Sequence, residues 1–125
     1  MIVEDIAKYL AQQGLGEFGT DIFGMAFPKD TDEGVCIYDG ISGISDTYCI
    51  VDNPAIQIIS RSSNSITAND KAIQAYKLLH GTIRSKQIGN TFIYQCFATG
   101  YPESIGRDAN GLWMWSMNMN LQIKY

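Results

Sequence analysis

The chain has 125 residues, of which 46% are hydrophobic and 18% charged, and this balance fits one globular domain over residues 1–125 and excludes a disordered protein. Its formal net charge of −4 at pH 7 argues against nucleic acid as the main partner, and no apolar run approaches the roughly 20 residues of a membrane-spanning helix. Residues 1–5 lack the basic start of a signal peptide, so we expect synthesis in the cytoplasm.

A first helix is predicted for residues 2–13. Ile2, Ile6 and Leu10 recur at the spacing that places side chains on one face of a helix. Gly14 follows, and glycine commonly ends helices because it adopts the left-handed conformation without strain. A helix with a single apolar face has to cover another surface, and we expect it to lie on a sheet.

Strand character follows in three stretches before the next helix: residues 16–28, 35–38 and 55–61. The segment 28–34 is acidic, but it lacks the ligand spacing of a calcium-binding loop and is interpreted as a solvated turn. The loop 39–46 contains glycines but lacks the lysine and the spacing of a phosphate-binding loop.

A second helix is predicted to begin near Thr67, since Thr67 and Asp70 resemble a capping box, in which side chains satisfy the first free amides. It is expected to end at Gly81. Its apolar face is supplied by five residues: Ala68, Ala72, Ala75, Tyr76 and Leu79.

The last third of the chain carries the clearest pattern. After a turn at 88–90, residues 91–99 are predicted as a strand, 100–111 as a long loop and 112–125 as a closing strand. Side chains alternate between the two faces of a strand. The apolar face of the closing strand holds Trp113, Trp115, Met117, Met119, Leu121, Ile123 and Tyr125. The other face holds Met114, Ser116, Asn118, Asn120, Gln122 and Lys124.

The connection between the last two strands is too short for a crossover helix, so we expect them to run antiparallel. The predicted order is α-β-β-β-α-β-β. It indicates an α+β fold with a mostly antiparallel sheet and two helices packed on one face.

No residue pattern indicates an active site, a cofactor or a metal. The only histidine, His80, falls at a helix end, where a structural role is expected. The odd number of cysteines, without metal-like spacing, indicates free thiols: Cys36, Cys49 and Cys96. A small ligand-binding α+β domain remains an alternative, with a pocket built from the distant carboxylates of Asp39, Asp46 and Asp52.

Several stretches in a fixed order carry a family resemblance: the opening helix up to Gly14, residues 52–61, Leu78-Leu79-His80-Gly81, Gly106-Arg107-Asp108-Ala109-Asn110-Gly111, and Met117-Asn118-Met119. Together they cover most of the chain. They resemble the minor capsid proteins of long-tailed bacteriophages that are similar to tail terminators. Leu112 departs from the pattern, because a basic residue is expected after the loop glycine.

The resemblance implies a structural, non-enzymatic protein of the virion, located at the tail or head–tail joint and made in the host cytoplasm. Such a protein forms a ring, typically a hexamer, that caps the tail tube, stops its growth and joins it to the head. Its implied partners are copies of itself, the tail tube protein and the head–tail connector, with no cofactor, no specific nucleic acid sequence and no membrane. Ring closure needs heterologous contacts, in which two different surfaces meet. A head-completion or stopper protein on the head side of the joint is the alternative.

Five residues are candidates for subunit or partner contacts: Arg61, Arg107, Asp108, Asn118 and Asn120. The two asparagines belong to an uncharged polar row that fits either sheet-to-sheet contact or solvent exposure. Arg107 and Asp108 lie in a loop, and loops often carry function. The alternatives are a local turn capped by Asp108, and an Arg61 that pairs with a carboxylate of its own chain.

Two other segments are considered for a role in assembly. Trp113 and Trp115 share one face of the closing strand, where packing in the core is favoured over an interface. The loop 39–46 is rich in glycine and serine, and we hypothesise that it becomes ordered only on assembly. Protection of this loop from proteolysis in the particle, but not in the free protein, would support that hypothesis.

Overall fold

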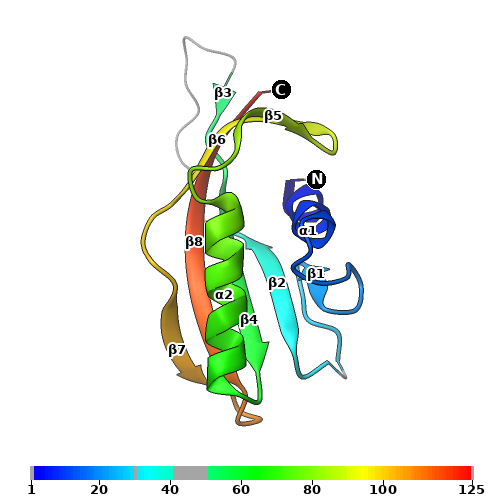
Figure 1. Cartoon of the computed structure of the whole chain (residues 1–125), viewed down its shortest axis with the longest axis vertical. Coiled ribbons are helices and arrows are strands. Elements are labelled where there is room, and N and C mark those ends of the chain that lie inside the picture. Colours follow the sequence, from blue (N-terminus) through cyan, green and yellow to red (C-terminus); the bar gives the residue numbers. More distant parts are fainter. Residues whose placement is uncertain (1, 30, 41–50, 125) are drawn as a thin grey trace.

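The computed structural model describes residues 2–29, 31–40 and 51–124, and Figure 1 shows their arrangement. The helices are α1 (Ile2–Gln12) and α2 (Ser65–Leu79). The strands are β1 (Ile22–Gly24), β2 (Gly34–Asp39), β3 (Val51–Asp52), β4 (Ala55–Ser62), β5 (Arg84–Ile88), β6 (Thr91–Ala98), β7 (Glu103–Arg107) and β8 (Trp113–Lys124).

All of these strands belong to one curled sheet with the order β1-β2-β4-β8-β6-β5, and both β3 and β7 pair with β8. Only β1 and β2 run parallel, and every other strand pair is antiparallel. The predicted α+β class with a mostly antiparallel sheet is therefore confirmed, as is the antiparallel pairing of β6 with β8.

The long strand β8 is the centre of the sheet. Along one side it pairs with the whole of β4, and along the other it pairs with β6 at its C-terminal half and with β7 at its N-terminal half. The predicted alternation holds in its middle, where Met117 and Met119 are buried while Asn118 and Asn120 are exposed. Ser116, predicted on the exposed face, is buried. Its side chain accepts a hydrogen bond from the neighbouring strand.

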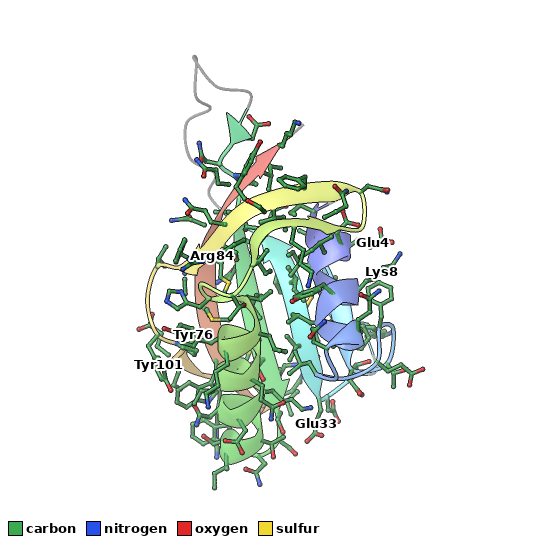
Figure 2. All side chains as sticks on the ribbon, turned by 45° about the horizontal axis from the view of Figure 1, so that its top comes forward. Glu4, Lys8, Glu33, Tyr76, Arg84 and Tyr101 are labelled. Atoms are coloured by element: carbon green, nitrogen blue, oxygen red, sulfur yellow. The ribbon has the colours of Figure 1, made fainter. Side chains whose placement is uncertain are left out.

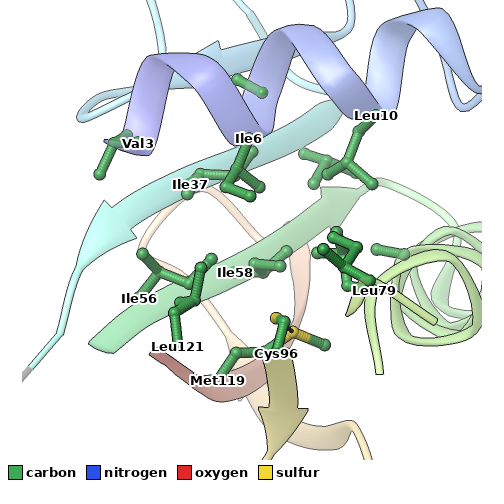
Figure 3. Packing of buried hydrophobic residues seen from close by; sticks show 14 of the residues in the cluster. Val3, Ile6, Leu10, Ile37, Ile56, Ile58, Leu79, Cys96, Met119 and Leu121 are labelled. Carbon is green, nitrogen blue, oxygen red and sulfur yellow. Dashed lines mark hydrogen bonds between the residues drawn. The ribbon is translucent and has the colours of Figure 1, made fainter. Parts of the chain in front are cut away.

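Both helices cover the same face of the sheet. The side chains of Val3, Ile6 and Leu10 on α1 point toward Ile37 and the sheet, as Figure 3 shows. Helix α2 lies along β4 and β8, and it faces them with small side chains and one leucine: Ala68, Ala72, Ala75 and Leu79. These small residues let α2 approach the sheet closely, so that the helices and the sheet enclose one apolar cluster.

The predicted start of the second helix was wrong. Helix α2 begins at Ser65, and its N-cap is Asn64 rather than Thr67. The Asn64 side-chain oxygen accepts hydrogen bonds from the amides of Ile66 and Thr67, at 2.9 and 3.4 Å. Asparagine is among the best N-cap residues because its short side chain reaches these free amides.

The predicted loop over residues 100–111 was also wrong, because strand β7 lies within it. Two further strands, β3 and β5, were not predicted. β5 and β7 lie at the margin of the sheet and are mostly exposed, so they lack the apolar alternation that marks a half-buried strand. Three predictions fall on residues outside the described ones: Tyr125 as the last residue of the strand, most of the loop 39–46, and Cys49.

Candidate interaction surfaces

Arg61 lies on the face of the sheet that the helices do not cover. Its guanidinium carbon is 4.0 Å from the ring centroid of Phe27, and its Nη2 donates a hydrogen bond to the carbonyl of Thr31. Its Nη1 is 3.8 Å from Oδ2 of Asp108, and both side chains are mostly buried, with 17% and 19% exposed. Arg61 therefore has partners within its own chain, as the alternative interpretation predicts.

Asp108 builds the turn between β7 and β8. Its Oδ1 accepts hydrogen bonds from the amides of Asn110 and Leu112, both at 2.9 Å, and its own amide donates to the Leu112 carbonyl. An aspartate that accepts amides from the residues after it fixes the chain reversal. These contacts are local, and a contact of Asp108 or Arg61 with a neighbouring subunit stays a prediction.

Arg107 is exposed at the end of β7. Its guanidinium carbon is 4.3 Å from the ring centroid of Trp113 across the β7–β8 pair, so the cation lies over an aromatic face. Trp113 is half-buried, and the neighbouring Trp115 has a buried indole nitrogen without a hydrogen-bond partner among the described residues. Of the three charged candidates, Arg107 is the one whose side chain remains available to a partner.

Asn118 and Asn120 are exposed on the face of β8 that points away from the helices. Next to them, Nε2 of Gln57 on β4 donates to Oγ of Ser116 at 3.1 Å. This part of the sheet is polar and uncharged, as predicted. The five candidate residues do not form one site, since Arg61, Arg107 and Asp108 gather around the β7–β8 turn while the asparagines lie farther along β8.

The surroundings of Cys36, Cys96 and His80 indicate a structural role for each of these residues. Cys36 and Cys96 are buried free thiols, and burial raises the pKa of both, that of Cys96 to about 12. A thiol with so high a pKa is not a nucleophile at neutral pH. His80 Nδ1 accepts a hydrogen bond from the amide of Ala98 at 2.9 Å, which satisfies a backbone group of β6 that faces α2.

The cavities are small. One of about 180 Å³ lies between the start of α2 and strands β2 and β4, and its lining includes Glu33, Arg61 and Lys71. Typical ligand pockets are roughly 300 to 1,000 Å³. Over residues 2–29, 31–40 and 51–124, no three of His, Cys, Asp and Glu come together as metal ligands. Neither described helix is long and apolar enough to cross a membrane.

Comparison with known proteins identifies the family of this chain. The family model described as bacteriophage tail terminator protein matches residues 9–125. The chain belongs to this family. A tail terminator is a structural component of the virion tail and not an enzyme, as predicted.

The fold of this tail terminator is similar to that of a chain in a solved structure of the virion of a native gene transfer agent particle. The TM-score is 0.62 at 12% sequence identity, and the match covers 86% of this chain and 81% of that chain. No curated protein matches the sequence.

The sequence prediction missed a group of aromatic side chains on the surface of this tail terminator, which we call the aromatic surface: Tyr76, His80, Phe97 and Tyr101. The rings of Tyr76 and His80 stack at a centroid distance of 4.8 Å. Tyr101 and Phe97 extend the row edge to face, at 5.2 Å from Tyr76 and 5.7 Å from His80. Three segments contribute: α2, β6 and the connection to β7. No sequence pattern links these three segments. Of the four residues, only Tyr76 is predicted from the sequence to lie on an apolar face, that of the second helix.

Proposed function

We propose that this tail terminator forms a ring, a hexamer, on the last ring of the tail tube, stops the growth of the tube and forms the joining surface toward the head. The chain acts as a single tail-terminator-like domain over residues 1–125. The observation that carries the proposal is the family match over residues 9–125. The similar fold of a virion protein supports it.

The described surface supports an assembly role. Several large apolar side chains of the described residues are exposed, and exposed apolar surface is typical of proteins that assemble with partners. The partners are copies of this chain, the tail tube protein and the head–tail connector. Arg107, Asn118 and Asn120 are exposed and have side chains available for these contacts, whereas Arg61 and Asp108 support the same region from within.

The test is electron microscopy of particles made when this gene is disrupted in its phage. If the protein stops the growth of the tube, its loss should leave tails of uncontrolled length beside unattached full heads. A complementing copy supplied in trans is the control, and it should restore tails of one length.

Two other outcomes would contradict the proposal. Tails of normal length beside unattached or leaking heads would move the protein to the head side of the joint, as a completion or stopper protein. Intact infectious particles would exclude both roles.

A further inference from the structure

The turn between β7 and β8 contains two neighbouring residues that can react with each other, Asn110 and Gly111. Asn110 is the one asparagine of the sequence that a glycine follows, and both residues are exposed to solvent. The side-chain carbon Cγ of an asparagine can be attacked by the backbone nitrogen of the next residue. Glycine hinders this approach least, because it has no side chain. Loss of a side-chain amide is therefore chemically easiest at this position of the chain.

The reaction consumes only water, and no atom is oxidised or reduced. The Gly111 nitrogen loses its proton and bonds to Cγ of Asn110, while the bond from Cγ to the side-chain nitrogen breaks and ammonia leaves with that proton. Water then opens the resulting imide ring at one of the two bonds to the Gly111 nitrogen. Cleavage at Cγ gives aspartate, and cleavage at the main-chain carbonyl gives isoaspartate, whose backbone is one carbon longer.

The fold engages the nitrogen that would attack. The Gly111 amide donates a hydrogen bond to the Asp108 carbonyl at 3.0 Å, and the Asp108 amide donates to the Leu112 carbonyl at 2.9 Å. The φ of Gly111 is left-handed at 78°. Together these features define a three-residue hairpin loop, made of a type I turn followed by a glycine bulge. The proton that the Gly111 nitrogen has to lose is therefore held in a backbone hydrogen bond.

The same turn fixes the backbone of Asn110. A type I turn that begins at Asp108 holds ψ of its third residue at about 0°, and ring closure requires rotation about that bond. The amides of Asn110 and Leu112 both donate to Oδ1 of Asp108 at 2.9 Å, which resists this rotation. The Asn110 side chain has no hydrogen-bond partner among the residues that the structure describes. The backbone, and not the side chain, therefore restrains the reacting pair.

We propose that Asn110 is a site of deamidation and that Asp108 controls its rate by closing the turn around it. The closed turn keeps the amide, whereas an open turn frees the Gly111 nitrogen and lets Asn110 rotate. Asp108 is a positioning residue, which acts through its carbonyl and its Oδ1 and takes no part in the bond changes. Local opening of an exposed turn costs less free energy than global unfolding, so the reaction proceeds slowly from the native state.

The modification changes the loop that joins Arg107 to Trp113. These two residues pair across β7 and β8, and the Arg107 guanidinium carbon lies 4.3 Å from the centroid of the Trp113 ring. Aspartate at position 110 adds a carboxylate to this loop. Isoaspartate also lengthens the backbone, so the hydrogen bonds of the turn cannot all be kept. The site therefore lies beside Arg107, whose side chain is available to a partner.

The test follows position 110 in the full chain, in mildly alkaline buffer and in the same buffer with concentrated guanidinium chloride. Cleavage after Arg107 and Lys124 yields a peptide of residues 108–124, and its gain in mass, located by fragmentation, measures the loss of the amide. The folded wild type should react at least about tenfold more slowly than the unfolded chain, because only open turns react.

Three variants separate the turn from overall stability. Asp108→Ala removes the acceptor of two amides and should raise the rate in the folded protein at least about fivefold. Asp108→Asn keeps an accepting oxygen and should retain the wild-type rate. Gly89→Ala should retain it too, because it destabilises the β5–β6 hairpin, where a β-carbon meets Asp5 on α1. Figure 1 shows this hairpin and the β7–β8 turn at opposite ends of the molecule, and Figure 2 shows the hairpin above α1, where Glu4 and Lys8 are labelled.

Four outcomes would overturn the inference. The first two are a folded wild type that reacts as fast as the unfolded chain, and an Asp108→Ala variant that reacts no faster than the wild type. Equal acceleration by Gly89→Ala would trace the reaction to global unfolding, and equal acceleration by Asp108→Asn would trace it to the charge. Circular dichroism checks that each variant is folded. The comparison of folded and unfolded wild type needs no variant, so it decides the matter even if Asp108→Ala does not fold.

Discussion

At the scale of single residues, the turn between β7 and β8 depends on Asp108. Its two oxygens have different tasks, since Oδ1 accepts two backbone amides while Oδ2 faces the Arg61 guanidinium. The hydrogen bonds fix the path of the chain, and the ion pair is long at 3.8 Å. The turn should therefore account for most of the contribution of Asp108 to stability.

Substituting Asp108 separates these contributions. Asp108→Ala should lower the free energy of unfolding by about 1–3 kcal/mol, because two amides lose their acceptor. Asp108→Asn keeps the accepting oxygen and loses only the charge, so its loss should be smaller, about 1 kcal/mol or less. Urea unfolding of both variants measures the difference. Equal losses would show that the ion pair, and not the turn, is what Asp108 contributes.

Burial of Cys96 predicts a pH dependence. Its pKa rises from an ordinary value of 9.0 to about 12, because the thiolate would be buried without solvent. Above pH 9 the unfolded chain loses this proton and the folded chain keeps it, so stability falls by about 1.4 kcal/mol per pH unit until the folded thiol also titrates.

The Cys96→Ala variant tests this linkage. Between about pH 8 and about pH 10 its free energy of unfolding should fall by roughly 1 kcal/mol less than that of the wild type. Tyrosine, lysine and the other cysteines titrate in both proteins and cancel in the comparison. Parallel pH profiles would contradict the burial of an ionisable thiol at this position.

At the scale of elements, the sequence predicted those whose pattern reflects a covered face. β8 alternates visibly because one of its faces carries Met117, Met119 and Leu121 into the core while the other faces away from the helices. β5 and β7 lack this signal, since their residues are mostly exposed and polar. They form strands because β6 and β8 present unpaired edges, and such pairing is a tertiary effect that local sequence does not encode.

The β5–β6 hairpin depends on Gly89. Its φ of 57° is left-handed, and a β-carbon there would overlap the carboxylate of Asp5, which is buried and accepts a hydrogen bond from Thr91 at 2.8 Å. Gly89→Ala should therefore destabilise the protein by about 2 kcal/mol or more, through strain and through displacement of Asp5.

Gly111→Ala is the matched control for this prediction. Its φ of 78° imposes a similar strain, but nothing lies within 4 Å of the added β-carbon, so the loss should be about 1 kcal/mol. Thermal unfolding compares the two variants. If Gly111→Ala were as destabilising as Gly89→Ala, the contact between α1 and the hairpin would not be what requires glycine.

At the scale of the whole molecule, the family could be predicted from ordered stretches of sequence, whereas the aromatic surface could not. Its members come from different parts of the chain: Tyr76 contacts Tyr101 and His80 contacts Phe97 because α2 ends beside β6. The sequence pointed instead to the β7–β8 turn, where Arg61 and Asp108 turn out to have partners in their own chain. The partners of Arg61 are Phe27, Thr31 and Asp108, which are distant from it in sequence, so local sequence could not show that this charge is satisfied within the chain.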